Sequence, residues 1–253
     1  GGLTLNYAID TSVTPAVFAV YGGQQAGNPE LDPWRSTNYD VSLEYYLNRS
    51  SMISIAAFYV DVASFIAQQG VTRCDLPDQD GVVRNRCVGI TGPSQGAGKS
   101  LHGLELGYKQ AFDFLPGKFR NLGADANFTY SPSNVGKDVA GNTIPFQENS
   151  ERQANLILWY QDSRFEARVA GNYRSKRAVS QDYGGIAGFE EYQAPTTYLD
   201  ASASYNFAKQ WQVFVDGSNL SGEIEKYYLV WPDMKLNTTQ FEKRYAIGVR
   251  AKF

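Results

Sequence analysis

Apolar and polar residues alternate with a period of two through much of this chain. One clear example is the segment 39–47, where apolar residues take the odd positions and polar residues take most of the even ones. Successive side chains of a β-strand point to opposite faces, so the pattern predicts a strand with one apolar and one polar face. Ten segments show this pattern or fit it by context: residues 3–10, 39–47, 52–66, 103–114, 122–131, 151–161, 163–175, 199–207, 210–216 and 241–253.

Short turns and long loops alternate between these segments. Long loops are expected at residues 11–37, 67–99, 132–150, 176–195 and 220–240, and short turns at 48–51, 115–118, 162–163 and 208–209. Outer-membrane barrels have this asymmetry, with short periplasmic turns and long outer loops, whereas compact soluble domains seldom carry such loops. Strands of about eight to sixteen residues also exceed the usual length in a soluble sandwich. We therefore predict an all-β fold, an antiparallel transmembrane β-barrel, in preference to a soluble sandwich.

Composition supports strands and excludes some functions. Aromatic residues make up 14% of the 253 residues and charged residues only 19%, a bias that favours strands over helices. No apolar run is long enough for a transmembrane helix. The net charge of −3 argues against binding to nucleic acid, so no nucleic-acid partner is expected.

The end of the chain resembles a known signal. Apolar residues recur at every second position up to a final aromatic residue, in the series Tyr245, Ile247, Val249, Ala251 and Phe253. Such an ending is similar to the assembly signal of bacterial outer-membrane proteins. The resemblance implies that the barrel-assembly machinery reads this strand, and an ordinary edge strand is the alternative.

Several segments together resemble the TonB-dependent receptors of bacterial outer membranes. The stretch from Gly27 to Tyr46 reads GNPELDPWRSTNYDVSLEYY and is similar to a receptor loop that descends into a strand. Residues 101–130, with their Leu-Pro-Gly turn, are similar to a later pair of strands. The segments ARVAGNYRS, DGSNLSGE and YAIGVRAKF follow in the expected order. The resemblance is closest to the Caulobacter-type and Xanthomonas-type branch, many members of which are associated with carbohydrate uptake.

This resemblance implies an outer-membrane location and a function in active transport. Such receptors have an N-terminal plug domain inside a barrel of about 22 strands. Residues 1–253 correspond to the C-terminal portion of the barrel, without the plug domain, and their start at Gly1 suggests a processed product or a piece of a longer protein. The protein would bind a scarce carbohydrate or iron chelate at its outer loops, and a TonB-type energy-coupling complex would act through the plug. Lipid, the plug and the remaining barrel strands are then expected partners, the last because residues 3–10 and 241–253 would otherwise be open edges.

The two cysteines fall in one predicted outer loop. Cys74 and Cys87 have twelve residues between them, and in an oxidising envelope a disulfide is the favoured pairing. In the chain-entropy model it would contribute roughly 3 kcal/mol. A metal site is the alternative, but no histidine lies nearby to complete it. Three aspartates of the same loop, Asp75, Asp78 and Asp80, lack the spacing of a calcium loop and are expected to be solvated. No metal or cofactor is predicted.

Candidate ligand-binding residues lie at the predicted outer mouth. Arg174 ends a strand that rises from the turn at Asp162, and Arg177 follows in the loop. They either contact a ligand or pair with carboxylates of the plug or of neighbouring strands. Exposed loop aromatics either stack on a ligand or pack together. They are Trp34, Tyr183, Tyr227, Tyr228 and Trp231.

Two other functions remain open from the sequence. A small passive porin would fit the short length. An outer-membrane enzyme would have to use His102, the only histidine. His102 shares its parity with Leu104 and Leu106, so it is expected to point outward near the outer membrane boundary, a poor position for activating a nucleophile. We therefore assign no catalytic residue and predict that the chain is not an enzyme.

Overall fold

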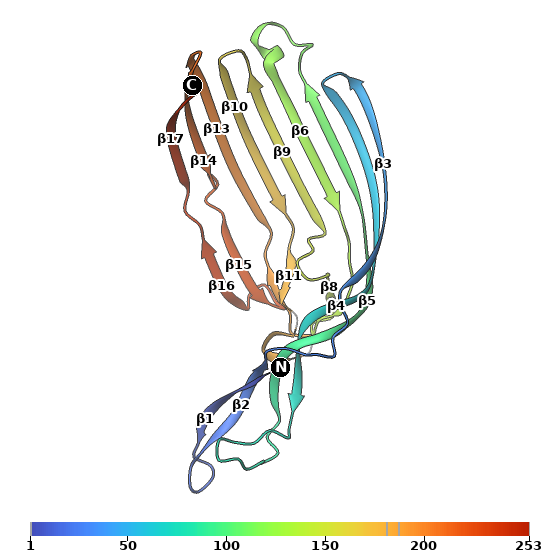
Figure 1. Ribbon diagram of the computed structural model, residues 1–253, viewed down its shortest axis with the longest axis vertical. Coiled ribbons are helices and arrows are strands. Elements are labelled where there is room, and N and C mark those ends of the chain that lie inside the picture. Colours follow the sequence, from blue (N-terminus) through green and yellow to red (C-terminus); the bar gives the residue numbers. More distant parts are fainter. Residues whose placement is uncertain (1, 181, 187, 253) are drawn as a thin grey trace.

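The computed structural model describes residues 2–180, 182–186 and 188–252 and is dominated by one eleven-stranded sheet (Figure 1). Two of its strands form a separate hairpin, and the other nine form a continuous antiparallel wall. In order across the wall these are β3 (Arg35–Asn48), β4 (Ser51–Arg73), β5 (Val88–Ala111), β6 (Leu122–Tyr130), β9 (Arg152–Gln161), β10 (Phe165–Arg174), β13 (Thr196–Ala208), β14 (Trp211–Ser218) and β17 (Arg244–Ala251). The all-β barrel fold predicted from the sequence is confirmed.

The register of the strands gives the wall two chemically different faces. Directly paired residues point to the same side of a sheet. One row across the strands is apolar, with Leu43 paired to Ile55, Ile55 to Leu106, Leu106 to Phe128 and Phe128 to Ala154. The adjacent row is polar or small: Glu44, Ser54, Gly107, Asn127 and Asn155. We call these two sides the apolar face and the polar face.

The ends of the wall differ as the loop pattern predicts. Short connections join the strands at the upper end in Figure 1, and long connections lie at the lower end. Gly117 has a positive φ of 60° in the turn after β5, which a residue with a side chain seldom adopts; it begins the short 3₁₀-helix η1 (Gly117–Asn121). No helix among the described residues is long and apolar enough to cross a membrane.

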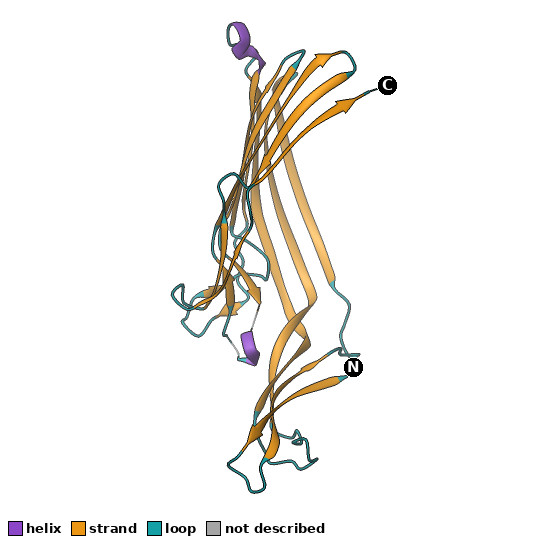
Figure 2. Cartoon of the chain, turned by 90° about the vertical axis from the view of Figure 1, so that its left-hand side faces the viewer, coloured by secondary structure: helices purple, strands orange, loops and turns teal. Residues whose placement is uncertain are grey.

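The N-terminal segment lies elsewhere than expected. β1 (Leu3–Asp10) pairs with β2 (Val17–Gln25), a strand in the region predicted as a loop. Their hairpin projects beyond the long-loop end (Figure 2) and joins β5 only through a short parallel pairing. The prediction that residues 3–10 form a wall strand is therefore wrong. Within the part of the chain that the structure describes, β3 and β17 are the edge strands of the nine-stranded wall, and each pairs with one neighbour.

Much of the predicted loop sequence is also strand. β4 and β5 continue past the wall and pair as far as Arg73 and Val88, so the loop expected at residues 67–99 shrinks to 74–87. The other long loops contain short strands. These are β7 (Gly136–Lys137), β8 (Thr143–Ile144), β11 (Arg177–Ser180), β12 (Glu191–Gln193), β15 (Ile224–Leu229) and β16 (Lys235–Gln240).

The final wall strand exposes its apolar side. Tyr245, Ile247 and Val249 of β17 are 70%, 80% and 60% exposed on the apolar face. Ala251 ends the strand, and Phe253 lies outside the described residues. The role of this series in barrel assembly stays a prediction.

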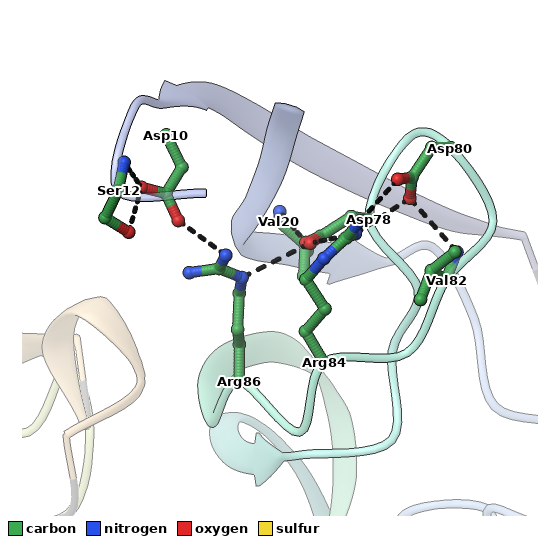
Figure 3. A network of polar contacts seen from close by, with 8 residues as sticks. All are labelled: Asp10, Ser12, Val20, Asp78, Asp80, Val82, Arg84 and Arg86. Atoms are coloured by element: carbon green, nitrogen blue, oxygen red, sulfur yellow. Dashed lines mark hydrogen bonds and ion pairs between the residues drawn. The ribbon is translucent and has the colours of Figure 1, made fainter. Parts of the chain in front are cut away.

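A buried carboxylate, that of Asp78, fastens the hairpin to the loop 74–87 (Figure 3). A disulfide between Cys74 and Cys87 closes this loop. The side chain of Asp78 is 1% exposed. One oxygen accepts the backbone N–H of Val20 in β2 at 2.9 Å, and the other accepts Arg84 at 2.8 Å and Arg86 at 3.3 Å. Arg86 also lies 2.5 Å from Asp10 at the end of β1. The hairpin is thus held through both of its strands.

The expectation that the aspartates of this loop are solvated is wrong for Asp78, which is buried, whereas the side chains of Asp75 and Asp80 are 65% and 38% exposed. Burial opposes the ionisation of Asp78, but the hydrogen bonds from Val20 and the two arginines outweigh it and lower its pKa. Arg84 lies 2.6 Å from Asp80 and lowers the pKa of that carboxyl to about 2. Asp75 is more exposed and pairs with Arg73. Beside this ionic cluster, Leu5 of the hairpin packs on a small core formed by Val20, Leu76, Val88 and Ile90.

Replacing Asp78 by asparagine should loosen the hairpin. The amide keeps the shape of the carboxyl but removes its charge, so Arg84 and Arg86 lose their buried counter-ion. Hydrogen exchange of residues 3–25 and 74–87, followed by mass spectrometry, should accelerate several-fold. Asp75→Asn is the matched control from the same loop, because an exposed ion pair contributes little. Unchanged protection of residues 3–25 in Asp78→Asn would contradict this assignment.

Candidate functional site

The long loops fold into a small structure over the lower end of the wall. β11, β12, β15 and β16 form a four-stranded sheet. It encloses a core in which Ala178 and Tyr192 are 0% and 1% exposed, together with Ile144. Tyr228 packs on this core, with its ring centroid 5.6 Å from that of Tyr192. Lys176 places its Nζ 5.0 Å from the centre of the Tyr192 ring.

A continuous chain of polar side chains runs across this outer structure. We call it the mouth network, and its members are Glu148, Arg177, Gln193, Tyr227, Glu225 and Tyr198. Arg177 pairs with Glu148 and donates to Gln193 Oε1 at 2.5 Å. Gln193 donates to the Tyr227 hydroxyl at 3.1 Å.

Glu225 ends the network by accepting hydrogen bonds from two phenols. The hydroxyls of Tyr227 and Tyr198 donate to its two carboxylate oxygens, each at 2.7 Å. Burial and the bond to Glu225 raise the pKa of Tyr227, so its hydroxyl stays protonated at neutral pH. The network joins wall strand β13 to three strands of the outer sheet.

A depression on the polar face lies next to the mouth network. It has a volume of about 620 Å³ and spans β10, β13, β14 and β17. Tyr198 of the network pairs with Asn172, which lines the depression, so the two are continuous. We call this the wall depression, and its polar lining includes Arg168, Asn172, Asp200, Ser202, Asp216 and Arg244. Two cations, two carboxylates, an amide and a hydroxyl can hydrogen-bond a polar solute here.

The two predicted ligand-binding arginines meet at the segment before β9. Arg174 donates to the Ser150 hydroxyl at 2.8 Å and to the Glu148 carbonyl at 2.9 Å, while Arg177 pairs with the Glu148 carboxylate. Both guanidinium groups therefore hold residues 148–150 in place. Their counter-ion comes from a loop and not from a neighbouring strand, and a direct contact with a ligand stays a prediction.

The predicted aromatic residues are divided among several places. Tyr227 belongs to the mouth network, and Trp231 makes an edge contact with Phe189 at 6.3 Å. Tyr183 lies in η2 (Tyr183–Gly185) and is 37% exposed. Trp34 is 58% exposed just before β3, at the opposite edge of the wall from β17. The structure thus brings together Arg174, Arg177 and Tyr227 but leaves Trp34 apart from them.

The sequence alone does not identify several residues of this region. Gln193 and Glu225 lie in segments without clear alternation, so the pattern does not predict on which side of the backbone their side chains lie. Arg168, Asp200 and Asp216 carry a usable signal, because their parity in strands predicts the polar face. Their assembly into one depression depends on the pairing of β10, β13 and β14, which is non-local. His102 lies where its parity predicts, on the apolar face opposite Tyr59.

The outer structure also contains a buried carboxyl, that of Glu190. It is 1% exposed, and its Oε2 has no hydrogen-bond partner in the described residues. Burial raises its pKa to about 7, and repulsion from Asp182 and Asp138 acts in the same direction. Asp138 itself accepts the Tyr192 hydroxyl at 3.1 Å and the Asn142 backbone N–H at 2.8 Å. No group of acidic, histidine or cysteine side chains suited to a metal ion occurs in the described ranges.

Comparison with protein families gives one match that covers most of the chain. Residues 2–220 match the family model described as TonB dependent receptor-like, beta-barrel. None of the curated proteins compared with the chain matches it significantly.

Several solved structures have a similar fold. The ferric enterobactin receptor PfeA of Pseudomonas aeruginosa aligns over 92% of this chain and 34% of its own length, with a TM-score of 0.61 and 15% identity. The ferric-catecholate import receptor Fiu of E. coli K12 aligns over 90% of this chain and 30% of its own length, with a TM-score of 0.56 and 15% identity. The siderophore receptor PirA of Acinetobacter baumannii aligns over 87% of this chain and 31% of its own length, with a TM-score of 0.55 and 17% identity. The chain spans about a third of the length of these proteins, and at such identities the likeness concerns the fold alone.

The carboxyl of Glu190 should make the outer structure sensitive to pH. In an opened segment it ionises near 4.5, but in the folded structure only near 7. The free energy needed to open this segment therefore falls as the pH rises from about 4.5 to about 7, and it does not change further above that range. Hydrogen exchange of residues 182–193, corrected for intrinsic rates at pH 5 to 8, should lose protection by roughly one to two orders of magnitude.

Glu190→Gln should remove this dependence, because its amide does not titrate. Glu242→Gln, at an exposed position outside the outer sheet, should behave like the unmodified protein. A pH dependence that persists in Glu190→Gln would refute the role of this carboxyl.

Proposed function

Since this chain belongs to the TonB dependent receptor-like β-barrel family, over residues 2–220, we propose that it forms part of a receptor that binds a scarce solute and imports it actively. Members of this family lie in the outer membrane of Gram-negative bacteria, and this chain is an outer-membrane protein. A TonB-type complex would supply the energy for import.

The chain, in this proposal, supplies the C-terminal wall of a larger barrel with a plug domain inside it. The open edges at β3 and β17 support this arrangement, because unpaired backbone groups are very costly in hydrocarbon. The polar face would then line the lumen and contact the plug, while the apolar face contacts lipid. The apolar series of β17 would be read by the barrel-assembly machinery during insertion.

The observation that carries the transport proposal is the continuity of the mouth network with the wall depression. Together they form a polar path from the outer structure down the lumen side of the wall. Arg174 and Arg177 already have partners within the protein, so the depression offers the better contacts for a solute. Arg168 and Arg244 would bind an anionic iron chelate, whereas Asp200 and Asp216 would accept hydrogen bonds from the hydroxyls of a carbohydrate.

Deletion of the complete gene should abolish a saturable uptake that depends on energy. Accumulation of a labelled ferric catecholate and of a labelled malto-oligosaccharide would be measured in deleted and complemented cells, with and without a protonophore. Loss of one of these activities, restored by complementation and sensitive to the protonophore, is the expected result. Unchanged uptake of both solutes, together with continuously open channels of the purified protein in planar bilayers, would contradict the receptor proposal and favour a passive porin.

Two substitutions in the wall depression should distinguish the solute classes. Arg244→Gln should weaken the binding of a ferric catecholate roughly tenfold, because a charge-assisted hydrogen bond is lost. Asp216→Asn should weaken the binding of an oligosaccharide to a similar extent. Arg164→Gln, at an exposed position in the short turn before β10, is the control. Binding to the purified full-length protein would be measured by calorimetry, and equal effects of Arg164→Gln and Arg244→Gln would exclude the depression as the site.

A further inference from the structure

The apolar face of the wall contains a depression of its own. It lies across β5, β6, β9 and β10, with Ile53 of β4 and Thr197 of β13 at its margins. It has a volume of about 690 Å³ and is lined almost entirely by apolar atoms. Small residues form its floor and larger ones its sides. Its central residues are Leu106, Ala126, Phe128, Ala154, Gly171 and Tyr173.

The strand register produces this depression. In one row Ala126 is paired with Leu156, and Leu156 with Gly171. In the next row Phe128 is paired with Ala154, and Ala154 with Tyr173. Small and large residues therefore alternate across three neighbouring strands. A Cβ atom added at Gly171 would meet no atom within 4 Å, so the space above this glycine is open.

A cationic side chain follows at the long-loop end of the depression. Arg152 lies two residues from Ala154 along β9, a distance of about 7 Å, and points to the same face. It pairs across the sheet with Tyr130. Its side chain is 61% exposed and lies 3.3 Å from the Glu151 carboxylate, which is itself 47% exposed.

The order of these groups matches the depth profile of a bilayer. Tyrosines are enriched at membrane interfaces, and Tyr130 and Tyr173 lie between the open floor and the long-loop end. Arg152 is therefore at the level of lipid headgroups, while Ala126 and Gly171 are at the level of acyl chains. His102 lies on the same face one row beyond the Leu104–Tyr130 pair, in β5.

We propose that the depression and Arg152 form a binding site for an anionic, phosphate-bearing membrane lipid, with an acyl chain in the depression and the phosphate at Arg152. The bilayer around the depression is already apolar. An acyl chain that enters the depression therefore gains dispersion contacts with its floor but no hydrophobic driving force. The charge of Arg152 supplies the selectivity. This site rests on the outer-membrane location of the chain and is independent of the transport proposal.

The selectivity should be modest. Exposed ion pairs contribute about 0.2–1 kcal/mol, and Glu151 competes with the phosphate for the guanidinium. A preference of roughly 1.4- to fivefold for an anionic over a zwitterionic headgroup follows from that range.

Native mass spectrometry of the full-length protein in detergent tests this site. The probes are phosphatidylglycerol and phosphatidylcholine with identical acyl chains, added in equal amounts. Arg152→Gln should bring the ratio of bound phosphatidylglycerol to phosphatidylcholine close to one by lowering the binding of phosphatidylglycerol, without weakening the binding of phosphatidylcholine. Gly171→Leu fills the depression and should reduce the binding of both lipids.

Matched controls separate these effects from general changes in the surface. Arg164→Gln removes an exposed arginine at the other end of the wall. Val169→Leu enlarges a neighbouring side chain on the same strand and face, outside the depression. Both should bind lipid as the unmodified protein does. An unchanged headgroup preference in Arg152→Gln, or unchanged lipid binding in Gly171→Leu, would overturn the proposal.

Discussion

Backbone hydrogen bonding in hydrocarbon is the constraint on which this structure depends. Water is absent from the bilayer core, so each N–H and C=O group of a membrane-spanning strand must bond to another strand. Antiparallel pairing from β3 to β17 meets this demand for every strand inside the wall. It also sets the register, and a shift by a single residue would move the row that contains Leu106 and Phe128 to the other face. The amphipathic pattern and the hydrogen bonds therefore specify one arrangement together.

Beyond the bilayer this constraint is relaxed, and other interactions hold the chain. The β1–β2 hairpin shares only a short parallel pairing with β5 and is fastened by the Asp78 carboxylate and a small apolar core. At the other side of the long-loop end, Arg174 and Arg177 hold residues 148–150. Buried ion pairs gain little free energy over apolar contacts, but breaking one leaves an unpaired charge. Such contacts fix the geometry of the outer structure more than they add to its stability.

The same distinction explains what the sequence predicts. Most wall strands were predictable because each presents one face to lipid, so apolar residues recur at nearly every second position, as in residues 39–47. β2 and β12 were not predictable, since glycine and glutamine residues in β2 hide the period and β12 has only three residues. The extension of β4 to Arg73 has the same cause. The position of residues 3–10 was wrong because alternation identifies a strand but not its partner. Arg174 and Tyr227 were recognised as outer residues, whereas Glu190 lies in a short segment whose burial depends on loops distant in the sequence.

Two glycines on opposite faces of the wall differ in what lies above them. On the polar face Trp159 covers Gly123, and a Cβ atom added there would lie 2.0 Å from the indole ring. This explains why a large aromatic residue occupies a position among polar neighbours: it packs against the chain itself. On the apolar face Gly171 has no such cover. A vacancy in hydrocarbon forfeits dispersion contacts on one side, and acyl chains are flexible enough to fill irregular surfaces. At Gly171 the packing can therefore be completed by lipid, whereas at Gly123 a side chain of the protein itself completes the surface.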